Sequence, residues 1–457
     1  MAPRRRCACA ETRALEPVPK KNCALKPSEA SQYRVYTARM GERSDILVIG
    51  AGVSGLASAL CLLERGRGVR VIDAGRVGGG SSHGNCGTLT PSHAGPLHAP
   101  GMVAQALGWM FTPDAPFYVR PRLDPSLWRW LLRFAARCNP RDWAASARPR
   151  AAILQASREA FPAWIADHGL HCEFAEPGAD CVFRDAAQLE AYARLLPALQ
   201  EMGIASRLLD GREYLAGEPA LREGVAGAVH FPGDAQLRPD RYVAELARAV
   251  VAAGGVVETG CEATGAEALA DGVRVATSLG ERRARDVVLA TGAWSPLLAR
   301  SLGLGWLRGA MQPGKGYSIT YARPSRVPRR PLTLYERKIC VTVWEDGFRL
   351  GSTMEFCGHD ASLNRRRLLA LERGAAEYLH EPVGPVKREE WYGWRPLCWD
   401  DLPIIGRAPG HRHLWLATGH GMLGVSMSPA TGRLLAELVT GQVPHLDPVP
   451  YSPERFA

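Results

Sequence analysis

The chain has 457 residues, of which 46% are hydrophobic and 22% charged, an ordinary globular composition that excludes a fibrous or disordered chain. Its length suits two interleaved domains, or one domain with a large added lobe. The net charge of +10 is concentrated at one end, because residues 1–39 carry nine Lys or Arg and three Glu, hence +6, and leave +4 for the rest. This balance argues against a nucleic-acid-binding protein.

Residues 1–43 are predicted to be a disordered or mis-assigned N-terminal extension. The stretch is rich in Pro, Arg and Lys, has no helix or strand period, and lacks the apolar run of a secretory signal. Met40 stands five residues before a strand-like segment that begins at Asp45. Translation from Met40 is one interpretation of this stretch, and a targeting arm is the other.

The 12 cysteines are scattered along the chain and form no Cys-x-x-Cys pair. Without a disulfide framework or a secretory signal, this usage predicts reduced thiols and a cytoplasmic protein. No group of His, Cys, Asp and Glu has the spacing of metal ligands, so no metal site is predicted.

A strand, a glycine turn and a helix follow one another near the start of the body. Asp45–Ile49 is typical of a buried strand, Gly50-Ala51-Gly52-Val53-Ser54-Gly55 follows at once, and Leu56–Leu63 predicts a helix. The next strand, Val69–Ile72, ends at Asp73, where an acid is expected to bind a ribose hydroxyl. Together these features predict a dinucleotide-binding site.

Each glycine of the turn is expected to be required for a different structural reason. Gly50 permits a tight turn, Gly52 lets a pyrophosphate approach the backbone, and Gly55 lets the helix pack against the strand, so that the helix N-terminus faces the phosphates. The same glycines interrupt the uncharged run Ile46–Leu63, and we therefore do not interpret that run as a membrane span.

Two later turns favour FAD over NAD. Asp286–Ala293 is a second buried-type strand that runs into a glycine, and Leu414–Gly424 repeats the pattern before a predicted helix at Ser428–Val439. Bare glycine amides and a helix N-terminus suit the electron-rich edge of a flavin. Only one fingerprint is present, whereas enzymes that pass electrons from NAD(P)H to a flavin usually carry two.

The chain resembles the D-amino-acid oxidase superfamily of FAD-dependent oxidoreductases, and within it the bacterial D-amino-acid dehydrogenases, over residues 44–445. Besides the fingerprint, the stretches that carry the resemblance are Ser81–Gly87, Ala99-Pro100-Gly101, Trp109-Met110, Lys315–Ser318, Trp394-Arg395-Pro396, Asp401–Gly406 and Gly419-His420-Gly421.

The resemblance implies an α/β fold, α+β overall. An FAD-binding Rossmann-like domain is assembled from discontinuous segments, 44–91, 216–300 and 391–445. An inserted antiparallel-sheet substrate lobe takes 92–215 and 301–390. The sequence patterns fit this arrangement: residues 92–215 are mostly helical with short strands such as Cys172–Phe174, Tyr317–Gly351 alternates like strands, and 225–300 supplies a helix near Arg241–Ala253 and strands at Val256–Glu258 and Asp286–Ala290.

The resemblance also implies the site residues. Arg395 is expected to pair with the substrate carboxylate through its guanidinium fork. Tyr317 is expected to bond the carboxylate or the amine, with a packing aromatic as the equal alternative. Lys315 lies near the flavin or on a solvated loop. The predicted cofactor-binding residues are Gly50, Gly52, Val53, Ser54, Gly55, Asp73, Ser82, Asn85, Gly87, Val257, Thr291, Gly292, Gly419, His420, Gly421, Met422, Leu423 and Gly424.

The implied reaction is transfer of a hydride from Cα of a small D-amino acid to flavin N5, after which the imino acid is hydrolysed to a keto acid and ammonia. Electrons then pass to a quinone or another non-oxygen acceptor. Three alternatives stay open: a glycine- or sarcosine-type oxidase that uses oxygen, a dehydrogenase of D-proline or hydroxyproline, and a flavin-binding protein without turnover. His83 does not match a covalent-attachment pattern, so non-covalent FAD is predicted.

Two further features concern the surroundings of the site. Trp399 stands where the dehydrogenases have smaller residues, and it is expected near the mouth of the site. The stretch from Leu127 to Arg137 predicts a helix with a basic stripe beside an apolar face, which packs into the lobe or, in the second interpretation, lies on the inner face of the cytoplasmic membrane.

Overall fold

The apolar run before the first glycine turn forms β1 (Arg43–Ile49), a central strand of a parallel sheet. It belongs to a computed structural model that describes residues 43–110 and 115–456, all within the unit Val35–Ala457. The predictions for the N-terminal extension, including a start at Met40, lie outside the described residues.

An eight-stranded sheet is built around β1. Its other strands are β2 (Val69–Asp73), β9 (Val256–Thr259), β10 (Ala263–Leu269), β11 (Gly272–Thr277), β12 (Gly280–Leu289), β18 (Ile404–Arg407) and β19 (Leu414–Thr418). β9, β2, β1, β12 and β19 are parallel to one another in that order. Because parallel strands end at the same edge of a sheet, the glycine turns after β1, β12 and β19 meet there, beside the end of β2.

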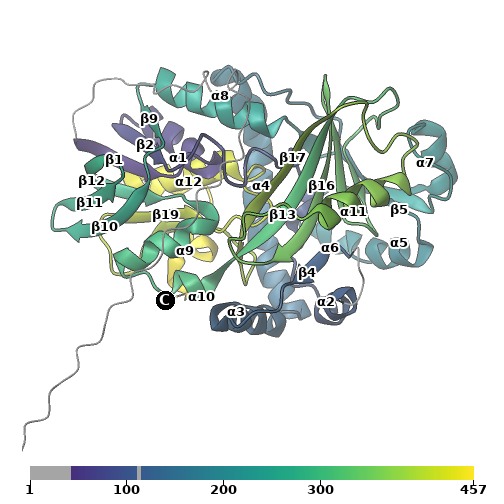
Figure 1. The fold of residues 1–457 in the computed structure, drawn as a ribbon, viewed down its shortest axis with the longest axis horizontal. Coiled ribbons are helices and arrows are strands. Elements are labelled where there is room, and N and C mark those ends of the chain that lie inside the picture. The colour runs from purple at the N-terminus through teal and green to yellow at the C-terminus, as the bar shows by residue number, and fades with distance from the viewer. Residues whose placement is uncertain (1–42, 111–114, 457) are drawn as a thin grey trace, which may run out of the picture. The chain divides into compact units, whose positions relative to one another are not determined.

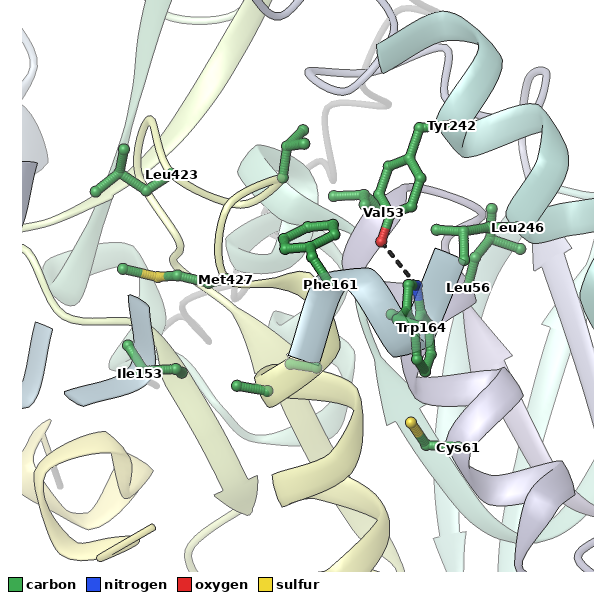
Figure 2. Packing of buried hydrophobic residues seen from close by; sticks show 14 of the residues in the cluster. Val53, Leu56, Cys61, Ile153, Phe161, Trp164, Tyr242, Leu246, Leu423 and Met427 are labelled. Atoms are coloured by element: carbon green, nitrogen blue, oxygen red, sulfur yellow. Dashed lines mark hydrogen bonds between the residues drawn. The ribbon is translucent and has the colours of Figure 1, made fainter. Parts of the chain in front are cut away.

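Four helices cover one face of this sheet: α1 (Val53–Glu64), α4 (Pro140–Asp167), α8 (Pro239–Ala252) and α12 (Ser428–Thr440). Figure 2 shows Phe161 and Trp164 of α4 packed among side chains of α1, α8 and α12. The indole of Trp164 donates a hydrogen bond of 3.0 Å to the Tyr242 hydroxyl. A buried polar tip satisfied in this way lets an aromatic side chain fill the core without a desolvation penalty.

A nine-stranded sheet forms the other half of the described fold (Figure 1). Its strands are β4 (Phe117–Val119), β5 (Ala179–Phe183), β6 (Arg207–Asp210), β7 (Gly227–Phe231), β13 (Met311–Ala322), β14 (Leu332–Leu334), β15 (Ile339–Val343), β16 (Gly347–Phe356) and β17 (Lys387–Cys398). β17, β13, β16, β15 and β14 form an antiparallel run in that order. The helix α11 (Arg365–Ala376) buries Leu368 and Leu371 against one face, which leaves the opposite face for a site.

The remaining elements are short connections and the helices of the segment before residue 220. They are β3 (Thr88–Leu89), η2 (Pro91–Ala94), α2 (Met102–Met110), α3 (Pro125–Ala136), α5 (Ala186–Ala193), α6 (Leu196–Glu201), α7 (Gly211–Gly217), β8 (Ala235–Gln236), η3 (Gly292–Trp294), α9 (Ser295–Leu298), η4 (Ala299–Leu302), α10 (Leu307–Ala310), η5 (Val449–Tyr451) and η6 (Pro453–Phe456).

The predicted fold class is confirmed, and so are the strands at the three glycine turns. The strand predicted at Cys172–Phe174 is wrong. Glu173 has a φ of +52°, which turns the chain there, and its carboxylate is held by Arg238 at 3.2 Å and Arg241 at 2.9 Å. The domain boundaries stay a prediction. By sheet membership, β7 belongs to the nine-stranded sheet although it falls in the predicted FAD-binding segment 216–300, and the boundary at 391 divides β17 of the same sheet.

Candidate active site

The glycine turn after β1 is fixed by close backbone approach. Gly50 has a φ of +115°, and a Cβ on it would lie 2.5 Å from the carbonyl oxygen of Ala290. A Cβ on Gly55 would lie 2.0 Å from the carbonyl oxygen of Gly50. Gly52 differs, since its nearest neighbour would be the Ser82 hydroxyl at 3.6 Å. The fold therefore requires glycine at 50 and 55, whereas Gly52 leaves open space at the N-terminus of α1, where a phosphate binds favourably.

Asp73 and Ser82 are held in place around this turn. The Asp73 carboxylate accepts hydrogen bonds of 2.8 Å from the backbone N–H groups of Ala51 and Gly75. Burial raises its pKa more than these two bonds lower it. The Ser82 hydroxyl accepts a bond of 3.1 Å from the N–H of Val53. The carboxylate is thus oriented at the end of β2, as the binding of a ribose hydroxyl requires.

A cavity of about 2060 Å³ extends from this edge of the parallel sheet to the free face of the nine-stranded sheet. Sixteen of the predicted site residues line it: Gly50, Gly52, Val53, Ser54, Asp73, Ser82, Asn85, Thr291, Gly292, Tyr317, Arg395, His420, Gly421, Met422, Leu423 and Gly424. The cavity therefore joins the three glycine turns to the two predicted substrate residues, and an elongated dinucleotide with a flavin end fits this course.

Gly55, Gly87, Gly419 and Val257 lie behind the lining of the cavity. A Cβ would lie 2.0 Å from the Leu237 carbonyl at Gly87 and 2.6 Å from the Cys398 sulfur at Gly419, so these glycines allow tight turns. Val257 is in β9, and its side chain is buried in the core. Direct contacts of these four with a cofactor remain predictions.

His420 is a neutral, fixed side chain. Its Nε2 is 3.0 Å from the Thr431 hydroxyl and its Nδ1 is 3.4 Å from the Ser54 hydroxyl. Burial lowers its pKa to about 4. The imidazole is therefore uncharged near neutral pH and contributes hydrogen bonds and shape, without a positive charge, to this wall of the cavity.

Arg395 lies on β17, and its guanidinium lies over a glycine of the neighbouring strand, where no side chain occupies the space. A Cβ on Gly316 of β13 would lie 2.3 Å from Nη1, so only glycine leaves room for the guanidinium. Nη1 donates a hydrogen bond of 2.5 Å to the carbonyl of Thr353. Among the described residues no carboxylate lies within 4 Å of it, and burial lowers its pKa. Such a cation, without a counterion and facing a cavity, is suited to an anionic ligand.

Sequence reasoning missed Thr353. The register of β13 and β16 shifts opposite Ser352, and Thr353 has a φ of +64°, which is unfavourable for a β-branched residue. Its hydroxyl is buried and has no hydrogen-bond partner among the described residues. This bulge points the Thr353 carbonyl at Arg395. No local pattern in the sequence signals it.

Tyr317 and Lys315 have partners of their own. The Tyr317 hydroxyl donates a bond of 2.8 Å to Glu355, and burial raises its pKa. Lys315 is fully buried and does not line the cavity; its ammonium donates to the carbonyl of Asp360 at 2.7 Å and to that of Ser362. The alternative of a solvated loop is wrong, because Lys315 is buried in β13, and its position near the flavin stays a prediction.

Trp399 does not lie at the mouth of the cavity. It packs edge-on against Phe456 with ring centroids 5.0 Å apart, and the Arg137 guanidinium stacks 4.3 Å above its ring. The expectation of a bulky residue beside the substrate was therefore wrong, because Trp399 turns into the core between the nine-stranded sheet and α3. The nearby Pro396 and Leu397 line the cavity instead.

One end of the cavity opens among exposed apolar side chains, which we call the apolar rim. The rim comprises Val103 (39% exposed), Leu107 (61%), Leu123 (104%), Trp128 (48%) and Leu132 (72%). α3 buries Leu127 and Trp130 and presents Trp128 and Leu132 outward together with Arg129 and Arg133. No helix among residues 43–110 and 115–456 has the length and apolar character needed to span a bilayer.

A strand, glycine turn and helix with an acid on the next strand line a cavity that also reaches a guanidinium without a carboxylate partner within 4 Å among the described residues, and this arrangement is typical of a dinucleotide-binding enzyme. Comparison with known families makes the class specific. Residues 45–438 match the family described as FAD dependent oxidoreductase, and the chain belongs to this family. Its cofactor is FAD.

Relatives and solved structures agree with this assignment. The chain is 33% identical over 423 residues to the D-amino acid dehydrogenase of Chromohalobacter salexigens, covering 90% of this chain and 99% of the relative. It is 36% identical over 410 residues to that of Paramagnetospirillum magneticum, with coverages of 87% and 95%. Its fold is similar to glycine oxidase from Geobacillus kaustophilus, with a TM-score of 0.72, 24% identity and coverages of 90% and 98%.

Proposed function

We propose that this enzyme catalyses the FAD-dependent oxidative deamination of a small D-amino acid and passes the electrons to a quinone or another non-oxygen acceptor. The observation that carries the proposal is Arg395, a guanidinium that faces the cavity and has no carboxylate partner within 4 Å among the described residues. The names of the relatives, D-amino acid dehydrogenase, favour the D-configuration and a dehydrogenase over an oxidase.

The side chains around Arg395 suggest how the substrate is held. The bond to the Thr353 carbonyl fixes Nη1, so the remaining N–H groups can grip a carboxylate in two parallel hydrogen bonds. Met354, Phe356 and Leu397 line the cavity nearby and keep water from the reacting carbon. FAD supplies the oxidant, which accepts a hydride from Cα. The neutral amine is thereby converted to an iminium, which water hydrolyses to a keto acid and ammonium.

The direct test is anaerobic bleaching of the flavin absorption by a panel of amino acids. D-amino acids are expected to bleach it and their L-enantiomers are not. Arg395→Ala is expected to keep its flavin and lose bleaching by at least about 10³-fold in rate, because a buried charged contact to the substrate is removed. No bleaching by any amine would overturn the proposal and leave a flavin-binding protein without turnover.

The same panel separates the alternatives. It includes glycine, sarcosine, D-proline and hydroxyproline isomers, since a glycine oxidase and a proline dehydrogenase share the fold. Admitting air or a quinone analogue to the bleached enzyme then identifies the acceptor. Fast recovery in air alone would support an oxidase, whereas recovery only with the quinone analogue is the expected result.

We further propose that the FAD is bound without a covalent link. His83, the one residue near a known attachment pattern, does not line the cavity, and its Nε2 lies 2.8 Å from a carboxylate oxygen of Glu389. Acid precipitation is expected to release all of the yellow colour into the supernatant. Colour that stays with the denatured protein would contradict this.

The apolar rim supports peripheral contact with a membrane. Exposed Leu107, Leu123 and Leu132 surround an opening of the cavity, and Arg129 and Arg133 lie beside them on α3. Such a combination binds anionic lipid surfaces through apolar burial and charge. Co-sedimentation with vesicles that contain an anionic phospholipid is expected, and Leu107→Asp combined with Leu132→Asp is expected to abolish it. Equal sedimentation of the wild type with neutral and anionic vesicles, or none at all, would contradict the proposal.

A further inference from the structure

The wall of the cavity beside Arg395 is apolar, and we call this wall the apolar pocket. Its members belong to one hydrophobic cluster, line the cavity and come from four elements, namely Phe117 of β4, Trp130 of α3, Met354 and Phe356 of β16, and Leu397 of β17. These elements are distant from one another in the sequence, so the pocket exists only in the folded chain. In the proposed reaction its side chains only exclude water.

Met354 joins the apolar pocket to the proposed carboxylate site. Its sulfur lies 3.9 Å from Nη1 of Arg395. A Cβ on Gly314 of β13 would lie 2.6 Å from this sulfur and 2.4 Å from Cδ1 of Leu397, so the two side chains lie together in the space that the glycine leaves. A carboxylate held by the remaining N–H groups of Arg395 is therefore bound next to Met354, at the entrance of the apolar pocket.

Aromatic rings extend the pocket beyond Met354. Phe117 is paired with Met354 in the register of β4 and β16. The ring of Phe356 meets that of Phe117 edge to face with centroids 5.9 Å apart, and lies 5.4 Å from the ring of Trp130. The indole N–H of Trp130 donates a hydrogen bond of 3.2 Å to the carbonyl of Ala310, so the polar atom of this side chain is used within the protein. The three rings thus contribute apolar surface to the pocket.

No second charged side chain acts on the guanidinium of Arg395. Besides burial, which lowers its pKa, only the thiols of Cys86 and Cys340 shift that pKa, and both raise it. No carboxylate and no other cation among the described residues has such an effect. The Tyr317 hydroxyl is bonded to Glu355, which does not line the cavity. A polar ligand group in the apolar pocket would therefore lose its hydrogen bonds to water without gaining new ones, which is unfavourable.

We propose that the apolar pocket holds the side chain of the substrate and that the preferred substrate is an amino acid with an apolar side chain. The inference rests on the proposed oxidation of amino acids and names the substrate class. Burial of an aliphatic side chain against Met354 and the rings is favourable, whereas an amide or a carboxylate of the same size is desolvated there without a partner. The pocket thus selects by the cost of desolvation, while Arg395 binds the carboxylate that all amino acids share.

A binding experiment tests the apolar pocket without turnover. 4-Methylpentanoate and succinamate correspond to leucine and asparagine without the amino group. They have the same number of non-hydrogen atoms and the same carboxylate, and differ in an isopropyl or an amide end. Both are titrated against the flavin absorption of the holoenzyme, and the wild type is expected to bind 4-methylpentanoate at least tenfold more tightly. Equal affinities, or tighter binding of succinamate, would overturn the inference.

Substitution of Met354 tests whether this preference comes from the pocket. Met354→Gln keeps the length of the side chain and adds an amide that can bond the amide of succinamate, so the preference is expected to fall below threefold. Met202→Gln is the matched control and should keep the preference, because Met202 is also partly buried but lies at the C-terminal end of α6, outside the lining of the cavity. If Met354→Gln does not fold, Met354→Ala replaces it and is expected to weaken binding of 4-methylpentanoate at least threefold, with succinamate unchanged. An unchanged preference in the Met354 variant would overturn the assignment of the pocket.

Turnover distinguishes failure of the inference from failure of the proposed function. D-Leucine is expected to reduce the flavin with a kcat/KM at least tenfold above that of D-asparagine, and Met354→Gln is expected to lower this ratio below threefold. Equal reduction by the two amino acids, with equal binding of the two carboxylates, would overturn the apolar pocket and leave amino-acid oxidation standing. No reduction by either amino acid, with 4-methylpentanoate still preferred, would overturn the oxidation alone.

Discussion

The two ends of the cavity are built in different ways. At the parallel sheet its wall is largely backbone: Gly50 has no room for a Cβ, and Gly52 exposes the first turn of α1. At the nine-stranded sheet its wall is made of side chains, among them Arg395 of β17 and Tyr317 of β13. A backbone wall tolerates no side chain and varies little, whereas a wall of side chains can change its ligand by single substitutions. On the proposed function, the first end holds the cofactor and the second contacts the substrate.

The largest effect is expected where a side chain is added to the backbone wall. Gly52→Val is expected to weaken FAD binding by at least 10³-fold, about 4 kcal/mol, because the added methyl groups occupy the space left for the ligand. The protein is expected to fold, since the nearest atom to a Cβ at this position is 3.6 Å away. The flavin-to-protein ratio and the dissociation constant of the reconstituted apoprotein measure the effect.

Gly217→Val is the control for that substitution, because a Cβ there meets nothing within 4 Å and the residue does not line the cavity. It should keep its flavin. If Gly52→Val also keeps its flavin, the turn does not contact the cofactor, and the contrast between a backbone wall and a side-chain wall fails.

The second-largest effect is expected on catalysis, when a residue of the side-chain wall is replaced. Arg395→Lys keeps the positive charge and removes the planar fork, so kcat/KM is expected to fall about 10²-fold, roughly 2.7 kcal/mol, with the flavin content unchanged. Stopped-flow reduction of the flavin measures it. Arg285→Lys, on the exposed end of β12, is the control. A loss of flavin in Arg395→Lys would show that the two ends of the cavity are not independent.

This contrast also explains how much could be predicted from the sequence. The fingerprint from Gly50 to Asp73 is local, because strand, turn, helix and acid follow one another within a single supersecondary unit. Arg395 was found only through the resemblance of its motif. Thr353 could not be found, since its position depends on a bulge in the pairing of β13 with β16, which no local pattern specifies. The wrong prediction for the position of Trp399 has the same cause, because its environment is set by α3, which lies far away in the sequence.

An intermediate effect is expected at His420, on the backbone side of the cavity. Burial lowers its pKa to about 4, below the value of about 6.5 in the unfolded chain, so the unfolded state binds the proton first as the pH falls. The contribution of the neutral His420 imidazole to the free energy of unfolding is complete above pH 6.5. It is lost below that pH by about 1.4 kcal/mol per pH unit, or roughly 2 kcal/mol at pH 5.

Urea denaturation of the wild type and of His420→Gln at pH 7 and pH 5 measures the pH-dependent part of the free energy of unfolding that comes from His420. The variant is expected to lose about 2 kcal/mol less between the two pH values. His171→Gln, at an exposed position, should match the wild type. Identical acid sensitivity in His420→Gln and wild type would show that the imidazole is protonated in the folded protein, and that this wall carries a charge.

The smallest effect is expected at Thr353, and its two parts have opposite signs. Glycine adopts a φ of +64° without the steric cost of a β-branched side chain, so Thr353→Gly is expected to raise the free energy of unfolding by about 1 kcal/mol. The same change loosens the carbonyl that orients Arg395, so the KM is expected to rise about threefold. Thr259→Gly, in an ordinary strand position of β9, should instead lower stability. A Thr353 variant that gains stability and keeps its KM would mean that the strain does not serve the substrate site, and the bulge would then belong to the packing of the sheet.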